Sequence, residues 1–114
     1  MTLEVLRMFV AITLVLFGVA AFVAPTALGK TVGLSTNSKG QAEIRISWGS
    51  LYLAMGAGAL LLDSAAAYQL IGLMFSAMAL ARTVHILHNR RLVDNTYLGI
   101  LAYEVVVAVL CLLA

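Results

Sequence analysis

Charged side chains are scarce in this 114-residue chain, at 11% of residues, whereas apolar residues make up 63%. Soluble domains carry about 25% charged and 45–50% apolar residues, so the composition excludes an ordinary water-soluble domain. The 7 Lys and Arg residues against 5 Asp and Glu residues leave a net charge of only +2, which excludes the basic surface that nucleic-acid binding needs. With a mean hydropathy of +1.05, the chain is predicted to lie in the lipid bilayer as a single transmembrane domain of residues 1–114.

Cysteine and proline each occur once. Cys111 therefore has no partner for an intrachain disulfide, a CxxC redox pair or a zinc site. His85 and His88 form an HxxH pattern without an acidic residue at helical spacing, so we predict no metal site. No HExxH motif, Ser/His/Asp set or phosphate-binding loop occurs either. We therefore expect no enzyme and predict no cofactor, while a bound lipid or quinone is compatible with the chain.

Long polar segments are also lacking, because four apolar runs fill most of the chain. They cover residues 5–24, 42–62, 65–87 and 96–114, and each has about the 20 residues that a helix needs to cross a bilayer. Their continuous character differs from the alternation of barrel strands. The predicted fold is all-α, an integral membrane four-helix bundle of antiparallel up-down topology, with the second and third runs forming a hairpin. The first run has a poor positive flank in Glu4 and Arg7, so we expect a membrane span rather than a cleaved signal peptide.

The basic residues are distributed unevenly between the two ends of these spans. The end that carries both termini has Arg7 alone, whereas the opposite end has the larger set: Lys30, Lys39, Arg45, Arg82, Arg90 and Arg91. Basic residues are retained on the cytoplasmic side, so both termini are predicted to lie outside the cytoplasm. Between the first two spans, Leu28, Val32 and Leu34 alternate with polar and glycine residues, and this segment is predicted to lie at the headgroup level.

Ionisable residues inside a span are costly and need an explanation. Arg82 lies in the last turns of the third span and Glu104 inside the fourth, so antiparallel packing of these two helices predicts an Arg82–Glu104 ion pair. The wider polar group is our candidate ligand-binding site: Glu43, Arg45, Tyr52, Arg82, His85 and Glu104. Three interpretations of it stay open at this point, namely a device that fixes helix packing, a ligand or proton site, and contacts of the arginines with lipid headgroups.

Two stripes at helical spacing predict which faces turn inward. On the second span, Arg45, Gly49, Tyr52 and Gly56 recur at intervals of four, three and four residues, which places them on one face toward a neighbouring helix. On the fourth span, the inward face is predicted from a seven-residue repeat with an alanine beside it: Tyr97, Glu104, Cys111 and Ala108.

The pattern also resembles a known family. The segments LGKTVGLS, AEIRISWGSLYLAMG, ALARTVHIL and AYEVVVA resemble the small four-span bacterial membrane proteins of the domain of unknown function 4345 family. In size and layout the chain is more distantly similar to DoxX-like four-helix membrane proteins, some of which are associated with quinone-linked redox enzymes. The resemblance implies a four-helix bundle in the bacterial cytoplasmic membrane and draws attention to the Glu43–Ile44–Arg45 element.

Three functions are weighed on these grounds. The first is a non-enzymatic accessory or structural subunit packed in a larger respiratory or photosynthetic membrane complex. The second is a module, as a homo-oligomer, that binds a lipid, quinone or small anion in a polar cleft open to the cytoplasm. The third is an intramembrane enzyme with Glu104 as acid or base and His85 as proton relay. The first is our prediction, with a membrane-protein partner and the bilayer as its surroundings.

Overall fold

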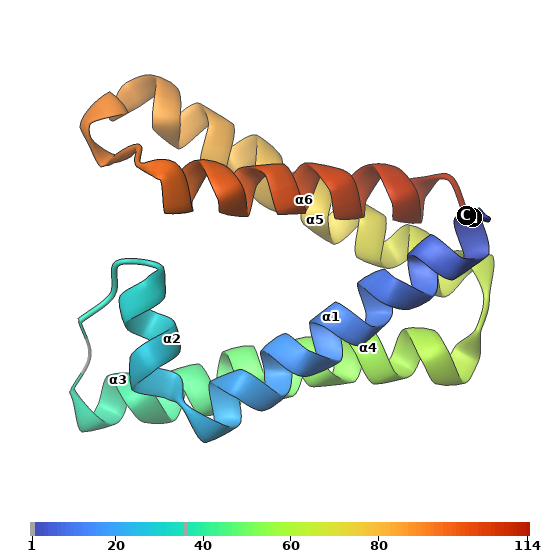
Figure 1. Ribbon diagram of the computed structural model, residues 1–114, viewed down its shortest axis with the longest axis horizontal. Coiled ribbons are helices and arrows are strands. Elements are labelled where there is room, and N and C mark those ends of the chain that lie inside the picture. Colours follow the sequence, from blue (N-terminus) through green and yellow to red (C-terminus); the bar gives the residue numbers. More distant parts are fainter. Residues whose placement is uncertain (1, 36) are drawn as a thin grey trace. The chain divides into compact units, whose positions relative to one another are not determined.

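The computed structural model describes residues 2–35 and 37–114, and this part of the chain is helical with no strand (Figure 1). Its elements in chain order are α1 (Leu3–Val23), α2 (Pro25–Thr31), α3 (Ser38–Glu43), the π-helix η1 (Ile44–Gly49), α4 (Ser50–Leu62), α5 (Ala65–His88), the short 3₁₀-helix η2 (Arg90–Leu92) and α6 (Asn95–Leu112). Four helical stretches are long and apolar enough to cross a membrane: Leu3–Val23, Ser38–Leu62, Ala65–His88 and Asn95–Leu112. The predicted all-helical class with four spans is therefore confirmed.

The chain divides into two compact units. The first unit combines the residues up to Arg7 with Ser64–Ala114, and the second unit consists of Met8–Asp63. Each unit contains one pair of packed long helices. The single-domain organisation, the hairpin of the second and third spans and the up-down order of all four spans stay predictions.

Helix starts are set by polar side chains that accept hydrogen bonds from free backbone N–H groups, as N-caps do. Ser64 accepts from the N–H of Ala67 at 3.2 Å, and Asp94 accepts from the N–H of Tyr97 at 2.8 Å. The third and fourth spans accordingly begin within a residue of their predicted starts. The second span begins at Ser38 rather than at residue 42, because the Asn37 side chain caps an additional helical turn.

In the second unit, α1 and α4 pack with their backbones in contact because glycines lie between them. A Cβ atom on Gly18 would lie 2.5 Å from the Leu53 nitrogen, and one on Gly56 would lie 2.5 Å from the Ala11 carbonyl oxygen. Ala11, early in α1, thus contacts Gly56, whereas Gly18, later in α1, contacts the earlier residue Leu53 of α4. The two helices therefore run antiparallel. Small residues that permit close approach are the usual means of helix association in membranes.

In the first unit, α5 and α6 lie side by side (Figure 1). The Gln69 side-chain amide donates to the Ala114 carbonyl at 2.8 Å, and a Cβ atom on Gly72 would lie 2.9 Å from the Leu112 nitrogen. Arg82, later in α5 than Gln69, contacts Glu104, which comes earlier in the chain than Ala114. The contacts therefore run in opposite directions along the two helices. The predicted antiparallel packing of the third and fourth spans is therefore correct.

α1 ends at Val23, shortly before Pro25, but the chain returns to helix at once. Proline has no N–H to lose at the first helical position, and α2 begins there. The end of α2 is closed by the N–H of Gly33 on the Lys30 carbonyl and by the N–H of Leu34 on the Gly29 carbonyl. This Schellman pattern needs a left-handed residue, and Gly33 supplies it with φ +85°.

Candidate functional site

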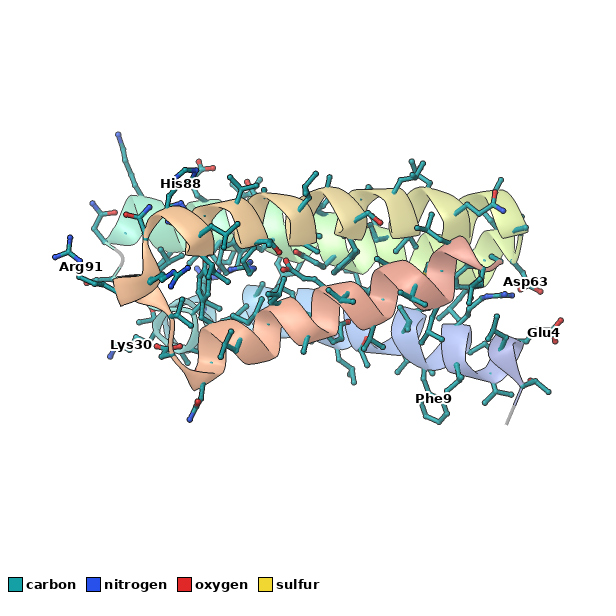
Figure 2. The ribbon with its side chains drawn as sticks, turned by 90° about the horizontal axis from the view of Figure 1, so that it is seen from above. Glu4, Phe9, Lys30, Asp63, His88 and Arg91 are labelled. Atoms are coloured by element: carbon teal, nitrogen blue, oxygen red, sulfur yellow. The ribbon has the colours of Figure 1, made fainter. Side chains whose placement is uncertain are left out.

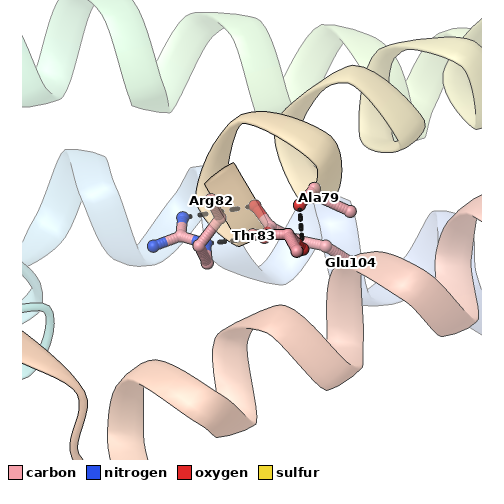
Figure 3. A network of polar contacts seen from close by, with 4 residues as sticks. All are labelled: Ala79, Arg82, Thr83 and Glu104. Carbon is pink, nitrogen blue, oxygen red and sulfur yellow. Dashed lines mark hydrogen bonds and ion pairs between the residues drawn. The ribbon is translucent and has the colours of Figure 1, made fainter. Parts of the chain in front are cut away.

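The charged centre of the first unit is the predicted ion pair. Arg82 Nε lies 2.7 Å from Glu104 Oε1, and Arg82 Nη2 lies 3.3 Å from Glu104 Oε2, so the guanidinium donates two hydrogen bonds to one carboxylate (Figure 3). Two-point contacts of this kind fix orientation as well as adding energy. The side chain of Glu104 is only 5% exposed and that of Arg82 26% exposed. The pair therefore lies within the helix pair and joins α5 to α6.

The depth of this pair follows from helix geometry. Arg82 lies six residues before the end of α5 at His88, and Glu104 nine residues after the start of α6 at Asn95. With a rise of 1.5 Å per residue, these separations are roughly 9 Å and roughly 14 Å. Tyr97 lies between Glu104 and that end, and its ring centroid is 4.8 Å from the Arg82 guanidinium carbon, a cation–π contact. Tyr97 was recognised in the sequence as an inward-facing residue but not as a partner of Arg82.

Beside the ion pair, Thr83 keeps its hydroxyl within its own helix. Thr83 Oγ1 donates to the Ala79 carbonyl oxygen at 2.8 Å (Figure 3). This is the usual way in which a hydroxyl inside an apolar helix is satisfied without a partner helix. Thr83 is therefore explained by local structure alone.

Arg45 of the second unit caps the end of α1. Its Nε donates to the Phe22 carbonyl oxygen at 3.0 Å, and Phe22 belongs to the last turn of a helix whose final carbonyls lack intrahelical donors. A cation at a helix C-terminus is also favoured by the helix dipole. Gly49 lies against the same residue, since its Cβ would lie 2.8 Å from the Phe22 ring. Both belong to η1, so the π-helix holds them on one face toward α1.

The remaining members of the predicted stripe on the second span also face α1. Tyr52 packs edge-on against Phe17 with ring centroids 4.6 Å apart, and Trp48 stacks on Phe17 with ring centroids 6.2 Å apart. Gly56 lies against Ala11. The predicted stripe of Arg45, Gly49, Tyr52 and Gly56 is therefore confirmed, and its neighbour is α1.

Arg7 performs a second capping interaction that sequence analysis did not find. Its Nε donates to the Leu110 carbonyl at 3.2 Å and its Nη2 to the Leu113 carbonyl at 2.8 Å. It therefore caps α6 in the first unit as Arg45 caps α1 in the second. The only signal in the sequence was an arginine near the start of the first span, and no pattern there identifies backbone carbonyls as its partners.

The other candidate residues are not brought to the ion pair. His85 is exposed on α5, in the same unit as Glu104, and the described residues include no hydrogen bond or ion pair between the two. Glu43 is exposed in the second unit at the end of α3. No group of three or more His, Cys, Asp and Glu side chains that could hold a metal ion occurs among the described residues.

The two ends of the first unit differ in charge. His88 and Arg91 lie at one end and Glu4 at the other (Figure 2). The Arg7–Leu113 hydrogen bond brings the N-terminal segment and the end of α6 together at the Glu4 end. This is the asymmetry on which the predicted orientation depends, and the compartment that each end faces stays a prediction.

These features define a small helical membrane protein whose helix pairs are joined by glycine contacts, a buried ion pair and arginine caps. The chain belongs to the family described as Domain of unknown function (DUF4345), which matches residues 2–114. The predicted membership is confirmed, whereas the more distant DoxX-like similarity is not shown. No curated protein and no solved structure matches the chain.

Proposed function

We propose that this protein is a non-enzymatic accessory subunit that packs against another protein in the membrane. The observation that supports this proposal best is the use made of its charged groups. Arg82 and Glu104 bind each other, and Arg45 and Arg7 bind carbonyls at helix ends. Each of these groups stabilises a helix pair of the chain itself, so helix packing accounts for them without any substrate.

A face of α4 supports a helical partner. Ser50, Ala54 and Gly58 recur four residues apart on α4, and a Cβ atom on Gly58 would meet nothing within 4 Å. The space beside Gly56, two residues earlier, is by contrast occupied by α1. Within the second unit this face is therefore uncovered. Since helices associate in lipid through small residues rather than through a hydrophobic driving force, we propose a transmembrane helix of the partner protein as its occupant.

The test is native mass spectrometry of the protein extracted from its own membrane in a mild detergent. We expect co-release with a second membrane protein at a fixed stoichiometry. Release as a free monomer or homodimer, without a second membrane protein, would overturn the accessory role whatever small molecule the chain carries, and would favour the alternative, a lipid-, quinone- or small-anion-binding module.

Two matched substitutions on α4 make this test specific. Gly58→Val fills the open face and is expected to dissociate the partner while circular dichroism of the purified chain is unchanged. Leu60→Val alters a side chain that is 38% exposed and, two residues after Gly58, lies on another face of the same helix, so it is expected to leave the complex intact. Equal retention of the partner by both variants would contradict the assigned face. A disulfide between Gly58→Cys and a second cysteine introduced on α5 or α6 of the same chain would contradict it too.

A further inference from the structure

A pocket of about 300 Å³ lies beside α2 in the second unit. It is lined by residues of α2 and of the segment that follows: Thr26, Lys30, Gly33, Leu34 and Ser35. Its polar groups are an ammonium and two hydroxyls, and it contains no acidic side chain. A lining of this composition suits an anion that accepts several hydrogen bonds.

The polar groups of this pocket are available to a ligand. The Lys30 ammonium and the hydroxyls of Thr26 and Ser35 have no hydrogen-bond or ion-pair partner in the described part of the chain. Thr31, next to Lys30, differs because its hydroxyl donates to the Ala27 carbonyl at 3.0 Å. Three residues of the pocket lining thus carry polar groups without an internal role.

Contacts with η1 and with the end of α2 fix the backbone around the pocket. A Cβ atom on Gly29 would lie 3.2 Å from Ile44 Cδ1, so α2 packs closely on the start of η1. The N–H of Leu34 binds the Gly29 carbonyl at 2.7 Å, which returns the chain across the end of α2. Thr26 and Lys30 are four residues apart on α2 and therefore share a face. These contacts hold the backbone around the pocket in place.

The position of the pocket relative to the span indicates the ligand. Thr26 comes three residues after the end of α1 at Val23, so the polar lining begins where the apolar span ends. Leu34 adds an apolar side chain that is 43% exposed to the same pocket. Residues 25–49 carry three basic side chains, Lys30, Lys39 and Arg45, against the single acid Glu43. Basic groups beside a membrane span attract anionic lipid headgroups.

We propose that this pocket binds the phosphodiester of an anionic phospholipid, with Lys30 on the phosphate oxygens, the hydroxyls of Thr26 and Ser35 donating to the same group, and Leu34 against the glycerol and acyl region. Phosphate oxygens are strong acceptors that suit an ammonium and neighbouring hydroxyls. This site is separate from the Arg82–Glu104 pair and does not depend on the accessory role.

The experiment uses the full chain in nanodiscs of phosphatidylglycerol and phosphatidylcholine in equal amounts, followed by native mass spectrometry of the lipid that stays bound after transfer to detergent. We expect one retained phosphatidylglycerol per chain. Lys30→Gln is expected to lower its retention about fivefold or more, and Thr26→Val combined with Ser35→Ala is expected to lower it as well. Lys39→Gln is the matched control because it removes the same charge nearby on α3, outside the pocket lining.

Three results would overturn the proposal. Equal loss in Lys30→Gln and Lys39→Gln would show attraction by overall charge rather than a site. Equal retention of phosphatidylcholine and phosphatidylglycerol would show no selection for an anionic lipid. Displacement of the lipid by inorganic phosphate at millimolar concentration, with phosphate binding to the lipid-free protein, would identify free phosphate as the ligand.

Discussion

Removal of one partner of the Arg82–Glu104 pair is expected to destabilise the first unit more than removal of both. Glu104→Gln leaves a guanidinium inside the span that keeps only the Tyr97 ring and a neutral amide as neighbours. Arg82→Met leaves a carboxylate whose side chain is 5% exposed. The double variant Arg82→Met/Glu104→Leu keeps similar volumes and removes both charges.

The magnitudes follow from depth and exposure. An unpaired charge at the centre of a membrane helix costs about 2.5–3.5 kcal/mol, and breaking a buried ion pair costs about 3–5 kcal/mol. Arg82 is 26% exposed and can extend toward the nearer end of α5, so we assign Glu104→Gln about 2 kcal/mol. Arg82→Met is assigned about 3 kcal/mol, and the double variant about 1 kcal/mol, because apolar replacement of a buried pair is often near neutral.

The assay is reversible unfolding in detergent by increasing denaturing surfactant, followed by far-ultraviolet circular dichroism. The single variant Glu104→Leu closes the double-mutant cycle and is assigned the same cost of about 2 kcal/mol as Glu104→Gln, because it leaves the same unpaired guanidinium; the coupling energy is then about 4 kcal/mol. Arg91→Met, at an exposed arginine outside the long helices, serves as the control and is expected to change the free energy of unfolding by less than about 0.5 kcal/mol. A double variant that costs the sum of the single variants, or a Glu104→Gln protein as stable as the wild type, would refute the reasoning.

Three further predictions concern helix contacts and ends, each measured by the same unfolding assay. Gly18→Ala is expected to lower the free energy of unfolding by at least about 2 kcal/mol, because the new Cβ would lie 2.5 Å from the backbone of α4. Gly58→Ala is expected to leave this free energy unchanged or to raise it by up to about 1 kcal/mol, because its Cβ meets no atom within 4 Å. Equal effects of the two variants would contradict the assigned packing. Arg45→Gln is expected to cost about 1 kcal/mol through loss of the charged cap on α1, and hydrogen exchange that stays unchanged at the end of α1 would contradict it. Asp63→Gly is expected to stabilise by about 0.5–1 kcal/mol because Asp63 has φ +43°, and a loss of stability would contradict this.

The sequence was sufficient to predict the features that depend on one helix or on one helix pair. Apolar run length gave four spans, and helical spacing gave the inward stripe that contains Gly49 and Gly56. The ion pair was predictable because Arg82 and Glu104 lie at compatible depths on consecutive spans. Each of these inferences needs only the geometry of a regular helix and the cost of a charge in lipid.

The features that were missed depend on backbone groups, which have no sequence signature of their own. The carbonyl of Phe22 is free because α1 ends nearby, and only the folded pair brings Arg45 to it. Arg7 reaches α6 from the opposite end of the chain in sequence. The π-helix η1 could not be read from periodicity either, because its six residues are too few to display a different period.

That π-helix makes the second span tolerant of a one-residue deletion. A π turn is closed by i→i+5 hydrogen bonds instead of i→i+4 bonds, so η1 behaves as a local insertion relative to a regular helix. Deletion of one residue within Ile44–Gly49 would let this turn close as a regular α-helix with α3 and α4 keeping their orientation about the common axis, whereas the same deletion within α4 would turn the two parts of that helix by about 100°, the angle of one residue in a helix. Homologous chains that are one residue shorter at η1 are thus expected to present the same side of the span to α1.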